Sequence, residues 1–260
     1  MIILLHSSKT MRSSPGKDVR LREPQLLSQA EQLAAYLKTL SPTQLTKIMG
    51  ISPALAEKTH ALIAAWTAKP ESQSLAIDSF VGDIYSGLHA NDLSPADRDY
   101  ADQTLCILSG LYGIIRPYDG ISLYRLEMGY TLPNPAFARL STYWGKSIAA
   151  CLPNRGPIIN LAAAEYAQTV TPFVDASRLV VPKFLTVSPK TGEPTFVVVH
   201  AKIARGAFAR WLISSRTSDI AALTQFDDLG YRFAQDLSSA DNPTFVCDTF
   251  GGKGRSIRLQ

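Results

Sequence analysis

The stretch Ile107–Gly129, ILSGLYGIIRPYDGISLYRLEMG, begins with an apolar run that is then broken by glycines and a proline. Four charged side chains stand among its aromatic residues: Arg116, Asp119, Arg125 and Glu127. Glycine permits close approaches that a side chain forbids, and arginine offers a planar donor for carboxylates or phosphates. The stretch is therefore typical either of a binding site or of a glycine-rich turn after a core strand, with internal ion pairs.

The composition is that of an ordinary folded protein: 260 residues, of which 46% are hydrophobic and 18% charged. The net charge of +4 is too small to demonstrate nucleic-acid binding by itself. Three cysteines without CxxC spacing and four histidines without ligand spacing exclude a disulfide framework and predict no metal site. We expect no cofactor.

Apolar runs are short throughout the chain. The run after Met1 ends at Leu5, whereas a secretory signal needs roughly 7 to 15 apolar residues. No later run reaches the ~18 residues that span a bilayer. The sequence thus predicts a cytoplasmic protein without a membrane partner, and we expect a monomer.

Hydrophobic periodicity and capping residues predict alternating strands and helices. Predicted strands cover residues 2–5, 158–161, 179–187, 195–200, 230–233 and 244–247. Predicted helices cover residues 23–39, 42–49, 53–66, 137–152 and 201–211, and a further helix starts at Ser94-Pro95 with Ala101, Leu105 and Ile107 on its late apolar face. This pattern predicts a mixed α/β (α+β) fold, a single domain over residues 1–260. We expect a central sheet of mostly short strands that is surrounded by helices.

Polar residues follow two of the predicted strands. Lys9 and Thr10 follow the first strand, where exposed backbone N–H groups and an ammonium can hold an anion, although a plain polar loop has the same composition. Glu165 and Tyr166 follow the strand at 158–161 and form either an acid/base pair or, for Glu165, a salt bridge to an arginine. The strand ends therefore supply candidate ligand-binding and catalytic groups.

Two further segments carry candidate site residues. Asp83, between Gly82 and Tyr85 in FVGDIYSGL, either pairs with an arginine or orients a ligand. Lys202 and Arg205 stand three residues apart in a predicted helix, so both can face a cleft.

Residues 41–66 predict two short helices joined by a tight turn, since each helix starts with a Ser-Pro pair. The arrangement resembles a helix-hairpin-helix, which grips nucleic-acid phosphates through hairpin N–H groups. The candidate DNA-binding residues are Lys47, Gly50, Ile51, Ser52 and Lys58. The usual second glycine is replaced by Ser52, and an ordinary pair of packed helices is the alternative.

Taken in order, nine segments make the chain resemble the YaaA family of bacterial peroxide stress proteins. They are SSKT (7–10), GISPALA, FVGDIYSGL, LSGLYGIIRPYDG with YRLEMG, YWGK (143–146), NLAAAEY, AKIARGAFARW and GYRF. The resemblance implies a single α/β domain with a cationic cleft, DNA binding and a role in the oxidative stress response. Lys9, Arg116, Lys202 and Arg205 would then be phosphate contacts, and Thr10, Arg125 and Glu127 would complete the ligand-binding or phosphate-binding set.

Several positions depart from the family pattern. The first strand end is closer to Ser-Pro-Ala-Lys-Thr in the family, whereas this chain has His6-Ser7-Ser8 before Lys9. Ala163 and Ile203 stand where the family commonly has Ser and Lys. A divergent member that acts as an enzyme on a small anionic or nucleotide-like substrate is therefore the alternative, with Glu165, Asp83 and Tyr166 as its catalytic groups.

Overall fold

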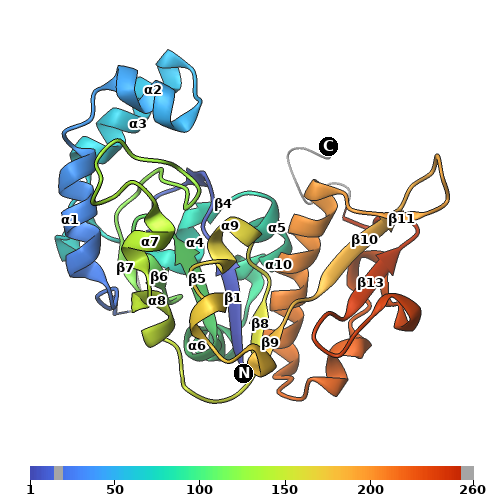
Figure 1. The fold of residues 1–260 in the computed structure, drawn as a ribbon. Helices are drawn as coiled ribbons and strands as arrows, with labels where there is room; N and C mark the ends of the chain where they lie inside the picture. Colours follow the sequence, from blue (N-terminus) through green and yellow to red (C-terminus); the bar gives the residue numbers. More distant parts are fainter. Residues whose placement is uncertain (15–19, 253–260) are drawn as a thin grey trace.

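Two strands whose residues are all buried, β1 (Ile2–His6) and β5 (Leu105–Ser109), pair in parallel at the centre of the fold (Figure 1). They belong to the computed structural model of the chain, which describes residues 1–14 and 20–252. The predicted domain also includes residues 253–260, which lie outside the described part of the chain. Strands buried on both faces read as continuous apolar runs, which explains IILL and LCIL in the sequence.

The first sheet has five strands in the order β6-β5-β1-β8-β9. Strands β8 (Ile158–Asn160) and β9 (Leu179–Val180) continue it in parallel, and β6 (Gly113–Ile115) is antiparallel to β5. Because β5 adds to one edge of β1 and β8 to the other, the strand order reverses at β1. Ligands of open α/β sheets bind at such a reversal, outside the carboxyl ends of the strands.

The second sheet has four strands in the order β11-β10-β13-β12. It contains β10 (Lys183–Val187), β11 (Pro194–Thr195), β12 (Tyr231–Phe233) and β13 (Thr244–Cys247). Helix α10 (Val198–Ser215) lies between the two sheets and contacts β1 and β10 (Figure 1). Two small antiparallel pairs complete the strands: β2 (Thr10–Met11) with β4 (Phe80–Val81), and β3 (Ser74–Leu75) with β7 (Gly120–Ile121).

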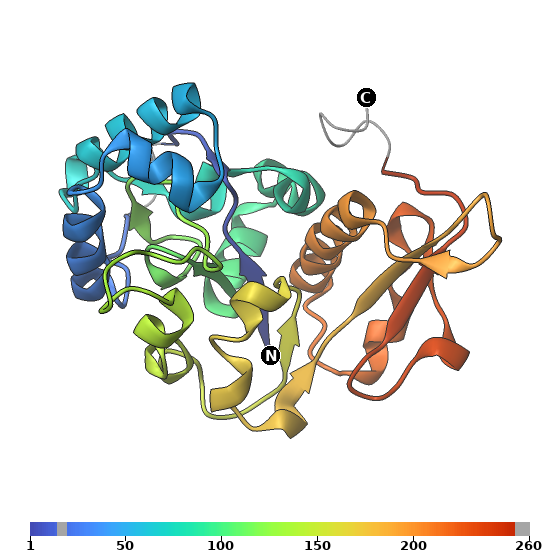
Figure 2. The ribbon, with the colours of Figure 1, turned by 45° about the horizontal axis from the view of Figure 1, so that its top comes forward.

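The remaining helices surround the first sheet. They are α1 (Leu27–Leu37), α2 (Pro42–Met49), α3 (Pro53–Ala65), α4 (Ala76–Ser79), α5 (Asp83–Leu88), α6 (Pro95–Thr104), α7 (Leu140–Trp144), α8 (Ser147–Ala150) and α9 (Ala164–Ala167). Figure 2 shows α1 to α3 on one side of β1, with α10 and the second sheet on the other. Ser41, Ser52 and Ser94 cap helices as expected, each accepting a backbone N–H of the first turn.

Two glycines bring helices α5 and α10 into backbone contact. A Cβ added to Gly206 would lie 1.8 Å from the carbonyl oxygen of Ile84, and one added to Gly87 would lie 2.0 Å from that of Ile203. No side chain fits at either position, so the crossing requires glycine on both helices. The contact places the first half of α10 beside the N-terminal end of α5 and the end of β1.

Three sequence-based boundaries are wrong. Residues 198–200, predicted as strand, open α10, so only Pro194–Thr195 pair with β10. Leu105 and Ile107, predicted on a helix face, lie in β5, because the backbone is extended from Leu105 onward. The helix predicted over 137–152 is broken into α7 and α8 at Gly145, whose φ of 46° is left-handed. The mixed α/β fold is confirmed, and its strands form several sheets, of which the five-stranded one contains β1 and β5.

No helix within residues 1–14 and 20–252 is long and apolar enough to cross a membrane.

Candidate functional site

A pocket of about 200 Å³ opens where β1 ends, at the reversal of strand order. Residues 6–10, at the end of β1 and just after it, form one wall. Residues 81–85, which lead into α5 and form its first turn, form another. Its polar lining includes five of the predicted site residues: Lys9, Thr10, Asp83, Glu127 and Lys202. Residues far apart in the sequence thus line one cavity.

Lys9 and Glu127 form an ion pair across this pocket, with 2.8 Å between Nζ and Oε2. Arg125 donates from Nη1 to the carbonyl oxygen of Lys9 at 3.0 Å, which anchors the segment that carries the lysine. Arg125 therefore supports the pocket wall through the backbone and is not among the residues that line the cavity.

Glu165, in α9, adds a second carboxylate near Glu127. Its Oε2 packs over Gly129, where an added Cβ would lie only 2.5 Å away, so the glycine makes room for the carboxylate. Burial, followed by the charge of Glu127, raises the pKa of Glu165, and the charges of Lys9 and Lys202 oppose this shift. A carboxylate whose pKa is raised, beside a second carboxylate and a lysine, is suited to proton transfer.

Helix α10 supplies two cations to the same region. Lys202 lines the pocket, and Arg205, one turn further along, lowers the pKa of the neighbouring His6 by its charge. Among the residues that the structure describes, neither cation has an ion pair or a hydrogen bond to a protein group. Burial lowers the pKa of Arg205.

His6 is a site residue that the sequence did not single out. It is the last residue of β1, lines the pocket and is only 7% exposed. Its Nδ1 accepts the backbone N–H of Ala163 at 3.2 Å, and its ring stacks on Tyr166 with 4.8 Å between centroids. Burial, then the charges of Arg205 and Lys202, lower its pKa from 6.5 to about 3, so the ring is neutral.

Tyr166 supports this wall from behind. Its hydroxyl accepts from Ser7 Oγ at 3.4 Å, and burial raises its pKa well above the ordinary value of 10. A phenol with such a pKa keeps its proton near neutral pH. Tyr166 is thus placed to position His6 and stays protonated.

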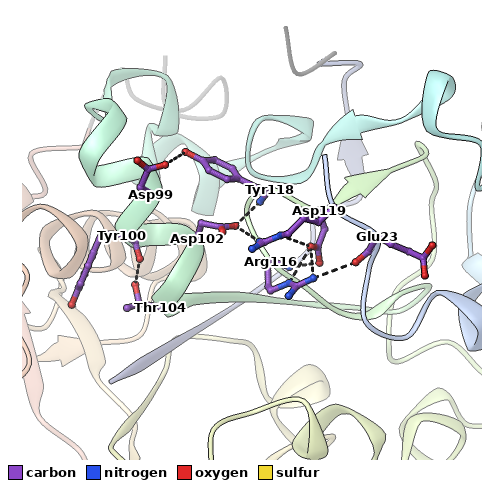
Figure 3. Close-up of polar contacts among 9 residues, drawn as sticks. Glu23, Asp99, Tyr100, Asp102, Thr104, Arg116, Tyr118 and Asp119 are labelled. Carbon is purple, nitrogen blue, oxygen red and sulfur yellow. Dashed lines mark hydrogen bonds and ion pairs between the residues drawn. The ribbon is translucent and has the colours of Figure 1, made fainter. Parts of the chain in front are cut away.

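Arg116 lies in a different network (Figure 3). Its Nε donates to Oδ1 of the buried Asp119 at 3.0 Å, its backbone N–H donates to Oδ2 at 2.9 Å, and Nη2 donates to the carbonyl oxygen of Glu23. Arg22 approaches the same carboxylate at 3.7 Å. Arg116 therefore closes a turn in the way that the ion-pair alternative described, and it does not line the pocket.

The turn between α2 and α3 stands apart from the pocket. Gly50 adopts the left-handed conformation with φ of 60°, and Thr46 accepts the N–H groups of both Gly50 and Ile51. Lys47, Ser52 and Lys58 are exposed, and the first turn of α3 has no acidic residue. None of these residues borders the 200 Å³ cavity.

No group of three or more His, Cys, Asp or Glu side chains in the described parts of the chain is arranged to hold a metal ion.

Comparison with known proteins agrees with the motif pattern. A family model described as "Peroxide stress protein YaaA" matches residues 1–237. A protein of Salinispora tropica described as "UPF0246 protein" is 58% identical over 258 residues, which cover 99% of this chain and 98% of the relative.

Proposed function

Because the chain belongs to the peroxide stress protein YaaA family, we propose that it acts in the peroxide stress response, and that it does so by binding a small anionic, phosphate-bearing molecule in the pocket at the end of β1. The observation that carries this proposal is the pair of cations, Lys202 and Arg205, which make no ion pair and no hydrogen bond with a carboxylate in the described structure. Partly buried cations without a partner are unfavourable unless an anion joins them.

The size and lining of the pocket favour a small ligand over a duplex. About 200 Å³ holds a phosphate or a small organic anion. Three carboxylates, those of Asp83, Glu127 and Glu165, stand at or beside the cavity, and contacts to a phosphate backbone do not require them. They are suited instead to move protons on a bound substrate, so the proposal includes catalysis by these groups with Tyr166 behind them.

Titration with inorganic phosphate, pyrophosphate and nucleotides by calorimetry tests the proposal. Lys202→Gln is expected to weaken binding about 10- to 100-fold, the range for one lost hydrogen bond to a charged group. Lys190→Gln is the matched control, since this exposed lysine lies in the β10–β11 turn, away from the cavity. Equal affinities for the wild type and Lys202→Gln, or no binding of any of these anions, would refute the assignment.

DNA binding is the second candidate, and the exposed α2–α3 turn is the feature that favours it. The N-terminal end of α3 carries the positive end of the helix dipole without an acidic residue in its first turn, and Lys47 and Lys58 flank it. Open space around Gly50 would let a phosphate approach the backbone.

Salt dependence distinguishes the two candidates. If the turn contacts two phosphates through its lysines, Lys47→Gln and Lys58→Gln each reduce the slope of log affinity against log salt by about 0.9. Lys202→Gln then leaves duplex affinity unchanged. A duplex affinity that does not depend on salt would show that the α2–α3 turn does not contact DNA. A loss of duplex affinity confined to Lys202→Gln would show the same.

A further inference from the structure

The imidazole of His6 is held rigidly by its neighbours. Tyr85 donates its hydroxyl to the carbonyl oxygen of His6 at 3.0 Å, Ala163 donates its N–H to Nδ1 at 3.2 Å, and Tyr166 stacks on the ring. Both ends of the residue are thereby fixed, so the position of its remaining ring nitrogen, Nε2, is fixed as well. Such preorganisation is typical of a group that must meet a ligand in one geometry.

The proton of the neutral ring lies on Nε2. A neutral imidazole has one N–H donor and one acceptor nitrogen, and the bond from Ala163 occupies Nδ1 as the acceptor. Nε2–H has no hydrogen-bond partner among the described residues, although His6 is more than nine-tenths buried and lines the pocket. Since no described residue accepts from this donor, a ligand or solvent atom in the cavity can serve as its acceptor.

We propose that His6 is a binding residue of the pocket whose Nε2–H donates to an oxygen of an oxyanion, with Lys202 and Arg205 balancing the charge of that anion. This inference rests on the small-anion function proposed above and adds the neutral donor at its centre. The ligand class is a phosphate, sulfate or carboxylate group. Since neutral imidazole holds its second proton tightly, His6 stabilises negative charge on the bound oxygen and does not transfer a proton.

Burial and two cations on α10, Lys202 and Arg205, keep the ring neutral. The other charged and titratable groups of this region are Tyr166 and Glu165 on α9, Asp83 and Tyr85 on α5, Tyr124 after β7, and Lys9 and Glu127 beside the pocket mouth. The two cations on α10 and burial act against the imidazolium form. A bound anion therefore meets the same donor throughout the range in which ordinary histidines titrate.

Two substitutions separate the ligand contact from the structural one. His6→Asn keeps an oxygen near the position of Nδ1 that can accept from Ala163, but it has no donor at the position of Nε2. His6→Gln places an amide N–H near the position of Nε2 and loses the acceptor for Ala163. With inorganic phosphate as the probe, we expect His6→Asn to bind about 10-fold or more weakly and His6→Gln to bind within about threefold of the wild type.

Thermal unfolding of both variants shows whether each is folded under the conditions of the titration. The opposite order, with His6→Asn binding like the wild type and His6→Gln binding weakly, would make His6 a support for Ala163 and overturn the inference. If Lys202→Gln weakens phosphate binding while both His6 variants bind normally, the proposed function stands and only the role of His6 fails. If the wild type binds no phosphate, both fail together.

The protonation state gives an independent readout. Nitrogen chemical shifts of the His6 ring should show the Nε2–H tautomer between about pH 5 and 8, and the Nε2 proton should shift when phosphate is added. Sulfate keeps a constant charge in this pH range, so its affinity can be measured as a function of pH. An inflection of sulfate affinity that is present in the wild type and absent in His6→Gln would show a titrating imidazolium and refute the neutral donor.

Discussion

Replacing Gly206 by alanine should push helices α5 and α10 apart. The new Cβ would lie 1.8 Å from the carbonyl oxygen of Ile84 and 2.6 Å from the amide nitrogen of Leu88. Carbon atoms of side chains pack at roughly 3.5 Å from their neighbours, so the helices must separate by about 1.5 Å. Both atoms belong to the backbone of α5, and no rotamer change can move them aside.

The expected loss of stability follows from two opposing effects. Overpacking of a filled interior costs about 1–3 kcal/mol, and the rigid backbone atoms at this contact place Gly206→Ala at or above the upper end. Alanine regains about 1 kcal/mol over glycine in a helix interior. A net loss of about 2 kcal/mol lowers the Tm of a chain of this size by about 4–8 °C.

Calorimetry of Gly206→Ala, Gly87→Ala and the double variant measures these effects. The double variant should lose less than the sum of the two single losses, because one separation of the helices relieves both contacts. Phosphate affinity should fall as well, since Lys202 stands one turn before Gly206. Gly192→Ala is the control: its added Cβ meets nothing within 4 Å, and it tests only the cost of a positive φ. An unchanged or raised Tm for Gly206→Ala would refute the backbone contact.

Three other variants or measurements follow from the described contacts. Arg116→Gln removes a partner of the buried Asp119, so the unfolding free energy should fall by about 2–3 kcal/mol while phosphate affinity is unchanged; a binding defect without a loss of stability would contradict the internal role. Glu165 has a raised pKa and is disfavoured in its ionised form, so Glu165→Gln should raise Tm slightly at pH 7, and this gain should vanish as the pH falls toward 4.5. Burial raises the pKa of Cys106 to about 12, so about one molecule in 10⁵ carries its thiolate at pH 7, and mass spectrometry should find Cys106 unmodified after peroxide treatment; oxidation at the rate of free cysteine would show that the site opens.

The convergence of the strand-end residues was predictable from the sequence because it depends on local pattern and on one rule of topology. Ile2–Leu5 and Ile158–Leu161 are continuous apolar runs, which is typical of strands buried on both faces of a parallel sheet. Their carboxyl ends lie at one edge, so Lys9 and Glu165 had to approach each other. The position of Lys202 could not be predicted in this way, because it depends on the close approach of α5 and α10, which Gly87 and Gly206 permit.

Helix α10 shows where local pattern fails. Val197, Val198 and Val199 are β-branched and favour a strand, yet the last two open the helix, because propensities of a few tenths of a kcal/mol per residue yield to burial along its length. Helix α10 contacts α5 as well as β10 and β1, which belong to different sheets. Its apolar residues therefore form no single stripe. A helix buried on several faces has no strong amphipathic period to read.

Arginines 116 and 125 stand in one motif and have different surroundings, and only one of them gave a local signal. Arg116 precedes Asp119 by three residues across Pro117, the spacing at which a turn brings a side chain back to a neighbouring carboxylate. Arg125 reaches the carbonyl oxygen of Lys9, a contact that no local spacing announces. Long-range contacts between a side chain and the backbone require the fold.

His6 illustrates the same limit at the candidate site. The sequence shows its place directly after the apolar run Ile2–Leu5, and polar residues at such a strand end are candidates for a binding site. Its chemistry was not visible, because the neutral state depends on burial and on two cations that the α5–α10 contact delivers from the other end of the chain. The two glycines and the imidazole are therefore linked: if α10 moves away in Gly206→Ala, the pKa of His6 should rise toward 6.5, and the ring should begin to titrate.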